Sequence, residues 1–429
     1  MSSQLQEGIY YRSKPQIGNS FCIMSLRAED NTGISEMGNI VGRIWNRLTK
    51  LKEGIVLDLD IDPKHRKTGG LTVLIGYGSK IFEMAGSKKI RPLTFSDNWN
   101  FKPPNRWGGG HIIEGSEMTY SLKVTENHML SDHVMFQFIA ENGFYTTRAA
   151  VEVWKELHKW KKKTGSCLLH IAGLYTGFQR PDQRNWQGFH DGVSNLKSRE
   201  RPYVISIGSR YLDSQDKWTL CGTYLAFMRI AIDLEMWEDT NIRDQERLVG
   251  RDKLTGCPIV RFDRNGRPVK DIRCPVSGTS EVIDAGNEYY RDYPQYGIKT
   301  QDKILQQSHI RQTRPIDRVP IWDRKSSRIY RQGFEFLVAI NDYPGFMAGL
   351  NFVSFQNTPE RLFKALTYAR KAIPNVRSLE SLPNFERFFS VSAAGIFFVP
   401  PTVKDEPYPG ARIFFSNAEL RNLSKSLSQ

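Results

Sequence analysis

Strand-like and helix-like segments follow one another in a similar order in both halves of the chain, and this pattern restricts the fold most. In the first half, apolar alternation predicts strands over 19–30, 71–78 and 133–140. Helical spacing of apolar residues predicts helices over 35–51, with Ser35 as its N-cap, and over 149–160. One face of the second helix is expected to carry Ala150, Val153, Trp154 and Leu157.

The second half repeats the pattern without repeating the sequence. Strands are predicted over 218–232 and 349–356, and helices over 233–250 and 358–373, the last with Thr358 as N-cap and Pro359 in its first turn. Two such halves predict two α+β domains, each a small sheet covered by helices on one face. The expected domains are 1–200 and 201–429.

Two segments lack clear periodicity. Gly- and Arg-rich residues 177–215 are the expected join between the domains, and 251–330 form a long polar, Pro-containing insertion. A segment this long without regular structure usually carries function.

The composition is that of an ordinary globular protein, with 39% hydrophobic and 25% charged residues. The net charge of +14 raises the question of a nucleic-acid surface, but the basic residues are dispersed. The one dense run, 159–165, is expected to be a solvated helix end. We therefore expect no nucleic-acid partner, and a basic surface that attracts small anions.

Five cysteines, Cys22, Cys167, Cys221, Cys257 and Cys274, are scattered and never paired as CxxC. This spacing argues against a disulfide framework or a zinc site and favours a reducing compartment. No apolar run is long enough to span a membrane, and neither a secretory signal nor a twin-arginine motif is recognised. The sequence thus predicts a cytoplasmic protein without a membrane partner.

The run GFHDGVSN, residues 188–195, places Asp191 between Gly188 and Gly192. A plain turn is one interpretation, because Asp and Gly dominate turns. None of the eight histidines has HxxxH or HxH spacing, so a multi-histidine metal site is not expected. A single histidine can still hold iron when haem supplies the other ligands.

The strand 349–356 is apolar on both faces, with Leu350 and Phe352 on one and Val353 and Phe355 on the other. One face can pack on helices, and the other needs either the neighbouring domain or a flat apolar cofactor. The residues alone favour domain packing. A lone arginine such as Arg331 is, by itself, most often a surface residue.

Taken together, these segments resemble the dye-decolourising peroxidases. GFHDGVSN is similar to their GxxDG signature, and SHIRQTRP (308–315) to the stretch that holds their proximal haem histidine. RIYRQGFEF (328–336), followed by GLNFVSFQNTPERLF, resembles the segment with the distal arginine and the strand over the haem. Segments 71–78 and 132–143 resemble the N-terminal domain, whereas the insertion and the C-terminal end are expected to lie outside the resemblance. The length resembles the larger, cytoplasmic-type members.

The resemblance implies a fold, a cofactor and an activity. The fold would consist of two ferredoxin-like domains, each an antiparallel sheet with helices on one face, and the C-terminal domain would hold most of a b-type haem (iron protoporphyrin IX). The protein would reduce hydrogen peroxide and oxidise dyes, phenols or other aromatic reductants, and it could form a homo-oligomer.

The resemblance also implies residue roles. His309 would be the axial iron ligand, Asp191 the distal acid and base, and Arg331 the cation that stabilises the cleaving peroxide. The further haem contacts would be Gly192, Asn195, Arg229, Arg311, Leu350 and Phe352. Some relatives carry an asparagine two residues after the distal arginine, where this chain has Gly333, so a distal asparagine is not expected.

Two other functions stay open. A haem-binding or haem-handling protein with little peroxidase turnover would keep His309 but need no acid at position 191. A basic nucleic-acid binder is suggested by the charge, but no motif supports it.

Overall fold

The computed structural model describes residues 3–9, 18–55, 67–95, 110–113, 116–119, 124–193, 195–209, 212–282, 300–313, 320–323, 326–370 and 388–426. Within these ranges, no helix is both long and apolar enough to cross a membrane.

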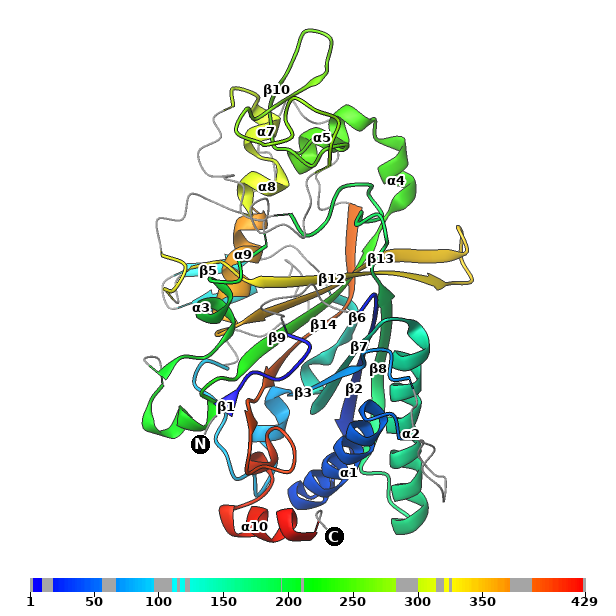
Figure 1. Cartoon of the computed structure of the whole chain (residues 1–429), viewed down its shortest axis with the longest axis vertical. Helices are drawn as coiled ribbons and strands as arrows, with labels where there is room; N and C mark the ends of the chain where they lie inside the picture. The colour runs from blue at the N-terminus through cyan, green and yellow to red at the C-terminus, as the bar shows by residue number, and fades with distance from the viewer. Residues whose placement is uncertain are drawn as a thin grey trace.

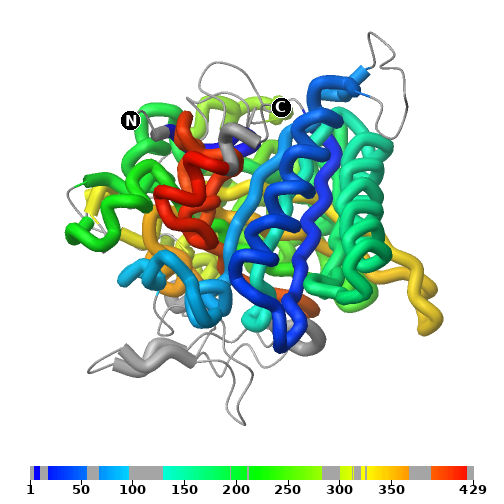
Figure 2. The backbone as a smooth tube through the Cα atoms, turned by 90° about the horizontal axis from the view of Figure 1, so that it is seen from below, coloured from blue at the N-terminus to red at the C-terminus, as the bar shows by residue number. Residues whose placement is uncertain are grey.

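Four strands and two long helices come from the N-terminal half. They are β2 (Ser20–Ala28), α1 (Ile34–Lys52), β3 (Thr72–Tyr77), β7 (Val134–Ala140), α2 (Gly143–Thr164) and β8 (Leu169–Phe178). The strands are antiparallel in the order β3-β7-β2-β8. Helices α1 and α2 lie side by side over one face of these strands (Figure 2).

Four strands from the C-terminal half form a second antiparallel group in the order β12-β13-β9-β14. Their bounds are β9 (Thr223–Ile232), β12 (Tyr330–Ala339), β13 (Phe346–Gln356) and β14 (Phe389–Val399). Helix α9 (Glu360–Arg370) follows β13, and α10 (Asn417–Ser426) ends the described chain.

The two groups join edge to edge, and in the described residues each join is a single bridged pair. Glu335 of β12 pairs with Phe178 of β8, and Phe398 of β14 pairs with Tyr77 of β3. A side chain at Gly177 would lie 2.8 Å from the carbonyl oxygen of Glu335, so this glycine lets the two backbones approach. The two predicted sheets are thus joined into one large antiparallel sheet, and β6 (Val124–His128) adds to it in parallel beside β14.

Alternation along the strands creates two apolar cores. One core lies between the strands and their covering helices and includes Met24, Ile44 and Val153. The other gathers the opposite faces of both strand groups, for example Phe21, Phe227 and Phe334. The second core therefore joins the two halves.

A separate lobe stands above the sheet, at the top of Figure 1. Its elements are α4 (Leu234–Asp239), α5 (Ile242–Val249), β10 (Ile259–Phe262), β11 (Pro268–Lys270), α7 (Lys303–Gln306) and α8 (His309–Gln312). Much of it comes from the insertion 251–330.

The remaining described elements are short. They are β1 (Ser3–Gln4), η1 (Ser79–Phe82), β4 (Gly110–Ile113), β5 (Ser116–Thr119), η3 (Met129–Ser131), α3 (Arg201–Ile205), η5 (Ser214–Thr219), β15 (Thr402–Val403) and η8 (Ala411–Ile413).

Several local predictions were wrong. Helix α1 is capped by Gly33, so Ser35 lies inside its first turn. Trp154 is exposed rather than on the buried face of α2 with Val153, because the buried stripe turns away from it. The helix predicted over 233–250 is two helices, since the side chain of Asn241 accepts a hydrogen bond from the Asp244 N–H and starts a new one.

The predicted division at 200/201 stays a prediction. Strand β8 ends at Phe178 and β9 begins at Thr223, so the predicted boundary falls between the two strand groups.

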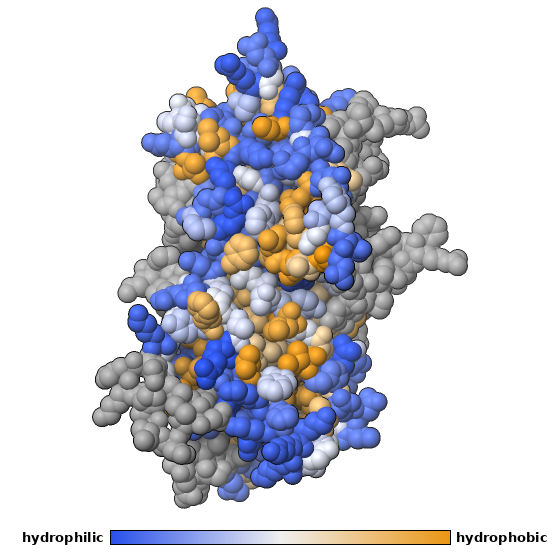
Figure 3. Space-filling view, turned by 90° about the vertical axis from the view of Figure 1, so that its right-hand side faces the viewer, coloured by the Kyte–Doolittle hydropathy of each residue, from blue (hydrophilic) through white to orange (hydrophobic). Residues whose placement is uncertain are grey.

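Apolar side chains gather midway along the face that Figure 3 shows. Elements on this side carry exposed apolar residues, including Trp154 and Leu174 and, on the β12–β13 hairpin, Leu337 and Phe346. Homo-oligomerisation stays a prediction.

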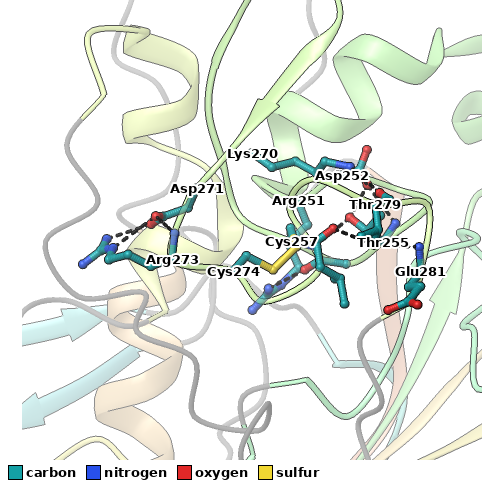
Figure 4. The surroundings of a disulfide bond; sticks show 12 residues. Arg251, Asp252, Thr255, Cys257, Lys270, Asp271, Arg273, Cys274, Thr279 and Glu281 are labelled. Atoms are coloured by element: carbon teal, nitrogen blue, oxygen red, sulfur yellow. Dashed lines mark hydrogen bonds and ion pairs between the residues drawn. A yellow bond between two sulfur atoms is a disulfide. The ribbon is translucent and has the colours of Figure 1, made fainter.

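The prediction that no disulfide forms was wrong. Cys257 and Cys274 are bonded, and the bond stands in the upper lobe among Arg251, Asp252 and Asp271 (Figure 4). Cys22, Cys167 and Cys221 are free. Because disulfides are rare in reducing compartments, the cysteines no longer support the cytoplasmic prediction.

Buried charges hold α1 to α2. Arg47 donates to Glu152 at 2.7 Å, and both side chains are almost fully buried. Burial alone would raise the pKa of Glu152, but hydrogen bonds from Arg148 and Arg47 hold it below its ordinary value. Arg43 makes a similar bond to Glu156, but 47% of its side chain is exposed.

Arg47→Ala is expected to lower the free energy of unfolding by about 3–5 kcal/mol, because it removes the buried partner of a buried carboxylate and leaves only the more exposed Arg148 and Lys155. Arg43→Ala is the matched control and should cost at most about 1 kcal/mol, since the exposed pair is screened by water. Denaturant titration of both variants measures the difference. Equal losses would show that Arg47 acts only by packing.

The disulfide predicts a thiol count. Unfolded, unreduced protein should present three reactive thiols, and reduced protein five, because Cys257 and Cys274 are joined. Cys257→Ser should present four thiols without reduction, since Cys274 is then released. Titration with a thiol reagent gives the counts, and five thiols before reduction would contradict the bond.

Candidate functional site

The loop that follows β8 makes the tight turns that its glycines allow. Gly188 and Gly192 have φ of +83° and +75°, in the left-handed region that favours glycine. Between them, the Asp191 N–H donates to the carbonyl of Gln183, and one carboxylate oxygen accepts the N–H of Gly192. The Asp191 side chain is exposed on the described chain. The loop therefore presents an acid with its backbone held in place.

Asn195 fastens this loop to β12. Its side-chain amide donates to the Arg331 carbonyl at 2.7 Å, and its side-chain oxygen accepts the Arg331 N–H at 3.2 Å. The Arg331 guanidinium donates back to the carbonyl of Val193 at 3.3 Å. These bonds bring Asp191 and Arg331, which are 140 positions apart in the sequence numbering, to one place.

One face of β12 carries Arg331, Gly333 and Glu335, because side chains alternate along a strand. On the neighbouring strand β13, Phe352 lies opposite Gly333 and Leu350 lies opposite Glu335, on the same face. Both apolar side chains are partly buried. Leu350 and Phe352 thus lie on the same sheet face as Arg331, opposite Glu335 and Gly333, and their contact with haem stays a prediction.

Gly333 makes room for the acid. A Cβ atom built there would lie 2.9 Å from an Asp191 carboxylate oxygen and 3.2 Å from the Leu350 side chain. The carboxylate therefore rests over the strand at the position where a side chain would stand.

Charge couples these groups. Burial lowers the pKa of the Arg331 guanidinium, and the charge of the Asp191 carboxylate offsets part of this decrease. Glu335 is buried, and desolvation followed by the Asp191 charge raises its pKa to about 8. At neutral pH, Glu335 is a neutral acid.

His309 opens the short helix α8, and its carbonyl accepts from both the N–H and the hydroxyl of Thr313. Burial, then the charges of Arg331 and Arg251, lower its pKa to about 4. The imidazole is therefore neutral at neutral pH, which is the form that binds a metal. Arg331 acts electrostatically on both His309 and Asp191, so all three border one region.

Two more arginines enrich this region in positive charge. Arg251 is buried and donates to the Gly256 carbonyl, and burial followed by the charges of Arg331 and Arg311 lowers its pKa to about 9. Arg311 donates to the Ile259 carbonyl, yet its buried Nε has no hydrogen-bond partner among the described residues.

This donor set fits haem. A neutral histidine suits the iron, an unsatisfied guanidinium nitrogen suits a propionate, and Leu350 with Phe352 suits the apolar ring. In the described residues, no group of three or more His, Cys, Asp or Glu side chains could hold a bare metal ion instead.

The disulfide supports the same loop. Cys257 and Cys274 pack with Val276 against Val193, whose carbonyl accepts from Arg331.

The structure does not bring Arg229 to the other candidates. It lies on β9 opposite Asn351, on the other face of the sheet from Leu350 and Phe352. Its guanidinium bonds the Asn351 side chain and stacks 3.7 Å from the centre of the Phe336 ring. A haem contact by Arg229 stays a prediction that this placement does not support.

Three features of the site were missed from the sequence. Glu335 and Arg251 look like ordinary surface charges, and the pairing of Cys257 with Cys274 has no motif. The acid at 335 could have been found from its spacing, because residues two and four positions after Arg331 lie on the same face of a strand.

The C-terminal part of the chain matches a protein family. The model for "Dyp-type peroxidase, C-terminal" matches residues 182–404. This match includes 251–330, so the expectation that the insertion lies outside the resemblance was wrong.

Curated relatives cover part of the chain. It is 27% identical over 239 residues to the deferrochelatase of Escherichia coli (strain K12), covering 55% of this chain and 46% of that protein. It is 26% identical over 223 residues to the deferrochelatase of Shigella flexneri serotype 5b (strain 8401), covering 52% of this chain and 44% of that protein. The chain thus spans about half the length of the curated relatives it matches.

Solved structures share the fold over nearly the whole chain. A DyP-type peroxidase from Cellulomonas bogoriensis has a TM-score of 0.65 at 19% identity, covering 96% of this chain and 97% of that one. DtpA from Streptomyces lividans, as an oxyferrous complex, also has a TM-score of 0.65 at 19% identity, with 96% and 98% covered. The α+β, ferredoxin-like fold is therefore confirmed. Because the family model covers more than half of the sequence, this chain belongs to the Dyp-type peroxidase family, whose members are haem peroxidases.

Proposed function

We propose that this chain is a haem b peroxidase that reduces hydrogen peroxide and oxidises dyes, phenols or other aromatic reductants. The observation that supports it most is that the loop of Asp191 is bonded to β12 at Arg331, so that the acid and the cation lie together. The charge of the same arginine also acts on His309, which is neutral. An acid, a fixed cation and an axial ligand are the groups that peroxide cleavage at haem requires.

In this proposal, the C-terminal half holds most of the cofactor. His309 is the iron ligand, Arg311 uses its buried Nε for a propionate, and Leu350 with Phe352 forms the apolar wall. Gly192 and Asn195 shape the loop beside the ring. Haem supplies, when bound, an iron centre with an open position at which peroxide is reduced.

The protein's own groups handle the proton and the charge. Asp191 takes a proton from one peroxide oxygen and returns it to the other, which leaves as water. Arg331 stabilises the negative charge that develops as the O–O bond breaks, because a guanidinium stays charged even when buried. Water competes little at Arg331, which is partly buried and fixed through its backbone by Asn195.

The reductant is proposed by class only. The net charge of +14 favours anionic aromatic molecules at the surface over cationic ones. A cytoplasmic location and the absence of nucleic-acid and membrane partners stay predictions.

A second candidate is a haem-handling protein with little peroxidase turnover. It is kept because the curated relatives are named deferrochelatase, a name that refers to iron rather than to peroxide. It requires His309 but assigns no task to Asp191.

The proposed function predicts a visible absorption spectrum typical of histidine-ligated haem, which changes after one equivalent of hydrogen peroxide. Asp191→Asn and Arg331→Ala should keep the resting haem spectrum but slow the reaction with peroxide by about 100-fold or more, because they remove the acid–base and electrostatic contributions. Stopped-flow spectroscopy measures the rates.

His309→Ala is expected to lose haem and serves as the binding control. Normal peroxide rates in both distal variants would refute the mechanism. A resting haem spectrum that ignores peroxide would favour the haem-handling candidate.

Gly333→Ala tests the placement of Asp191. Its methyl group would meet the Asp191 carboxylate, so the reaction with peroxide should slow by about 10-fold or more while haem stays bound. Gly278→Ala is the matched control, because a Cβ there meets nothing within 4 Å. Equal rates for the two variants would show that the acid tolerates displacement.

A further inference from the structure

Glu335 is a buried acid that the proposed mechanism does not use. It is 4% exposed, although glutamate is rarely buried without a charged partner. It stands in β12 at the bridge to Phe178 of β8. A buried carboxyl group in this place requires either a function or a compensating contact.

The strand places Glu335 next to Asp191. Arg331, Gly333 and Glu335 share one face, and successive positions on that face are roughly 7 Å apart. The Asp191 carboxylate occupies the space above Gly333, 2.9 Å from where a Cβ would be. Asp191 therefore lies between the guanidinium on one side and the glutamate on the other, within reach of a side chain as long as glutamate.

The groups around Glu335 are few. Across the strands it faces Leu350 of β13 and Phe178 of β8, which are apolar. From the loop, the Trp186 N–H donates to its carboxyl group at 3.3 Å. Of the charged loop residues that act on it, Arg180 is bonded to Asp182, and Asp191 exerts the larger charge effect.

Burial and the Asp191 charge raise the pKa of Glu335 to about 8, so it carries a proton at neutral pH. Asp191 is exposed and beside a cation, so the two acids have opposed surroundings. Acids whose surroundings differ in this way divide acid and base roles between them.

We propose that Glu335 is the proton partner of Asp191: a neutral carboxylic acid, buried in β12 beside Gly333, that donates its proton to the Asp191 carboxylate. The pairing of Glu335 with Asp191 is inferred from the positions of these residues in the chain, whereas its use in peroxide reduction rests on the proposed function. Glu335 is a positioning residue, because it acts through Asp191.

The step is a proton transfer without electron transfer. The O–H bond of Glu335 breaks, an O–H bond forms on Asp191, and the negative charge moves to Glu335. Solvent can restore the pair through Asp191, which is exposed. Reduction of peroxide to two waters takes up two protons with two electrons, so a proton held beside the distal acid has a use.

Infrared spectroscopy of the holoprotein, without peroxide, tests the pairing. The carbonyl stretch of a protonated carboxyl should be present at pH 7 and missing in Glu335→Gln, and it should titrate away near pH 8. Asp191→Asn should move that titration to lower pH by about one unit, because it removes a like charge. Absence of a difference between wild type and Glu335→Gln, or an unmoved midpoint in Asp191→Asn, would overturn the proposal.

Two controls separate the specific pairing of Glu335 with Asp191 from general effects of charge. Glu246 is a buried acid with a pKa raised to about 7 by burial and, among charges, by Asp252, so its titration should not respond to Asp191→Asn. Asp182→Asn removes an exposed aspartate from the same loop and should shift Glu335 less than Asp191→Asn does. An equal shift from both loop variants would overturn the specific pairing.

The rate of reaction with peroxide against pH tests the use of the proton. In wild type the rate should fall as Glu335 ionises near pH 8. This alkaline decline should vanish in Glu335→Gln and should return at a different pH in Glu335→Asp. A decline that persists in Glu335→Gln would overturn the role in turnover. If no variant reacts with peroxide, the proposed function fails, while the infrared result still decides the pairing.

Discussion

The site depends on one pair of hydrogen bonds, those between the Asn195 side chain and the backbone of Arg331. A side-chain amide can donate and accept at once, so Asn195 fits an N–H and a carbonyl of the same strand residue. A third bond, from the Arg331 guanidinium to the carbonyl of Val193, adds to this tie between the end of the GxxDG loop and β12. Because Asn195 bonds the backbone N–H and carbonyl of Arg331, these two bonds leave the guanidinium available for chemistry.

The electrostatic surroundings keep the His309 imidazole neutral and the Glu335 carboxyl group protonated. Desolvation, followed by the charges of Arg331 and Arg251, lowers the pKa of His309 to about 4 and so keeps the imidazole neutral at neutral pH. Desolvation, followed by the Asp191 charge, raises the pKa of Glu335 to about 8 and so keeps this carboxyl group protonated at neutral pH. Positive charge in a water-poor region thus prepares it for an anionic ligand, while the acid–base groups remain in defined states.

Sequence patterns were sufficient for most of the frame. The strands around Phe136 and Val353 and the helices around Ile44 and Val153 could be predicted, because their apolar periods follow strand and helix geometry. Motif order identified the family and the loop of Asp191.

Properties that depend on contacts distant in sequence could not be predicted. The Cys257–Cys274 bond needs the fold of the lobe, and the burial of Glu335 needs the junction of β8 with β12. Helix caps failed for a local reason, since Gly33 can begin a helix through backbone geometry without a polar side chain.

The junction between the two strand groups has a mechanical consequence. The Asp191 loop continues from β8 while Arg331 belongs to β12, and a single bridge connects these strands in the described chain. Besides side-chain hydrogen bonds, aromatic rings meet across the halves: Phe21 of β2 stacks on Phe334 of β12 at 4.5 Å, and Tyr175 of β8 lies 5.3 Å from Phe227 of β9. Apolar association weakens on cooling. Cooling therefore weakens the apolar part of this junction, while the hydrogen bonds between Asn195 and Arg331 still hold the acid loop to the strand of the guanidinium.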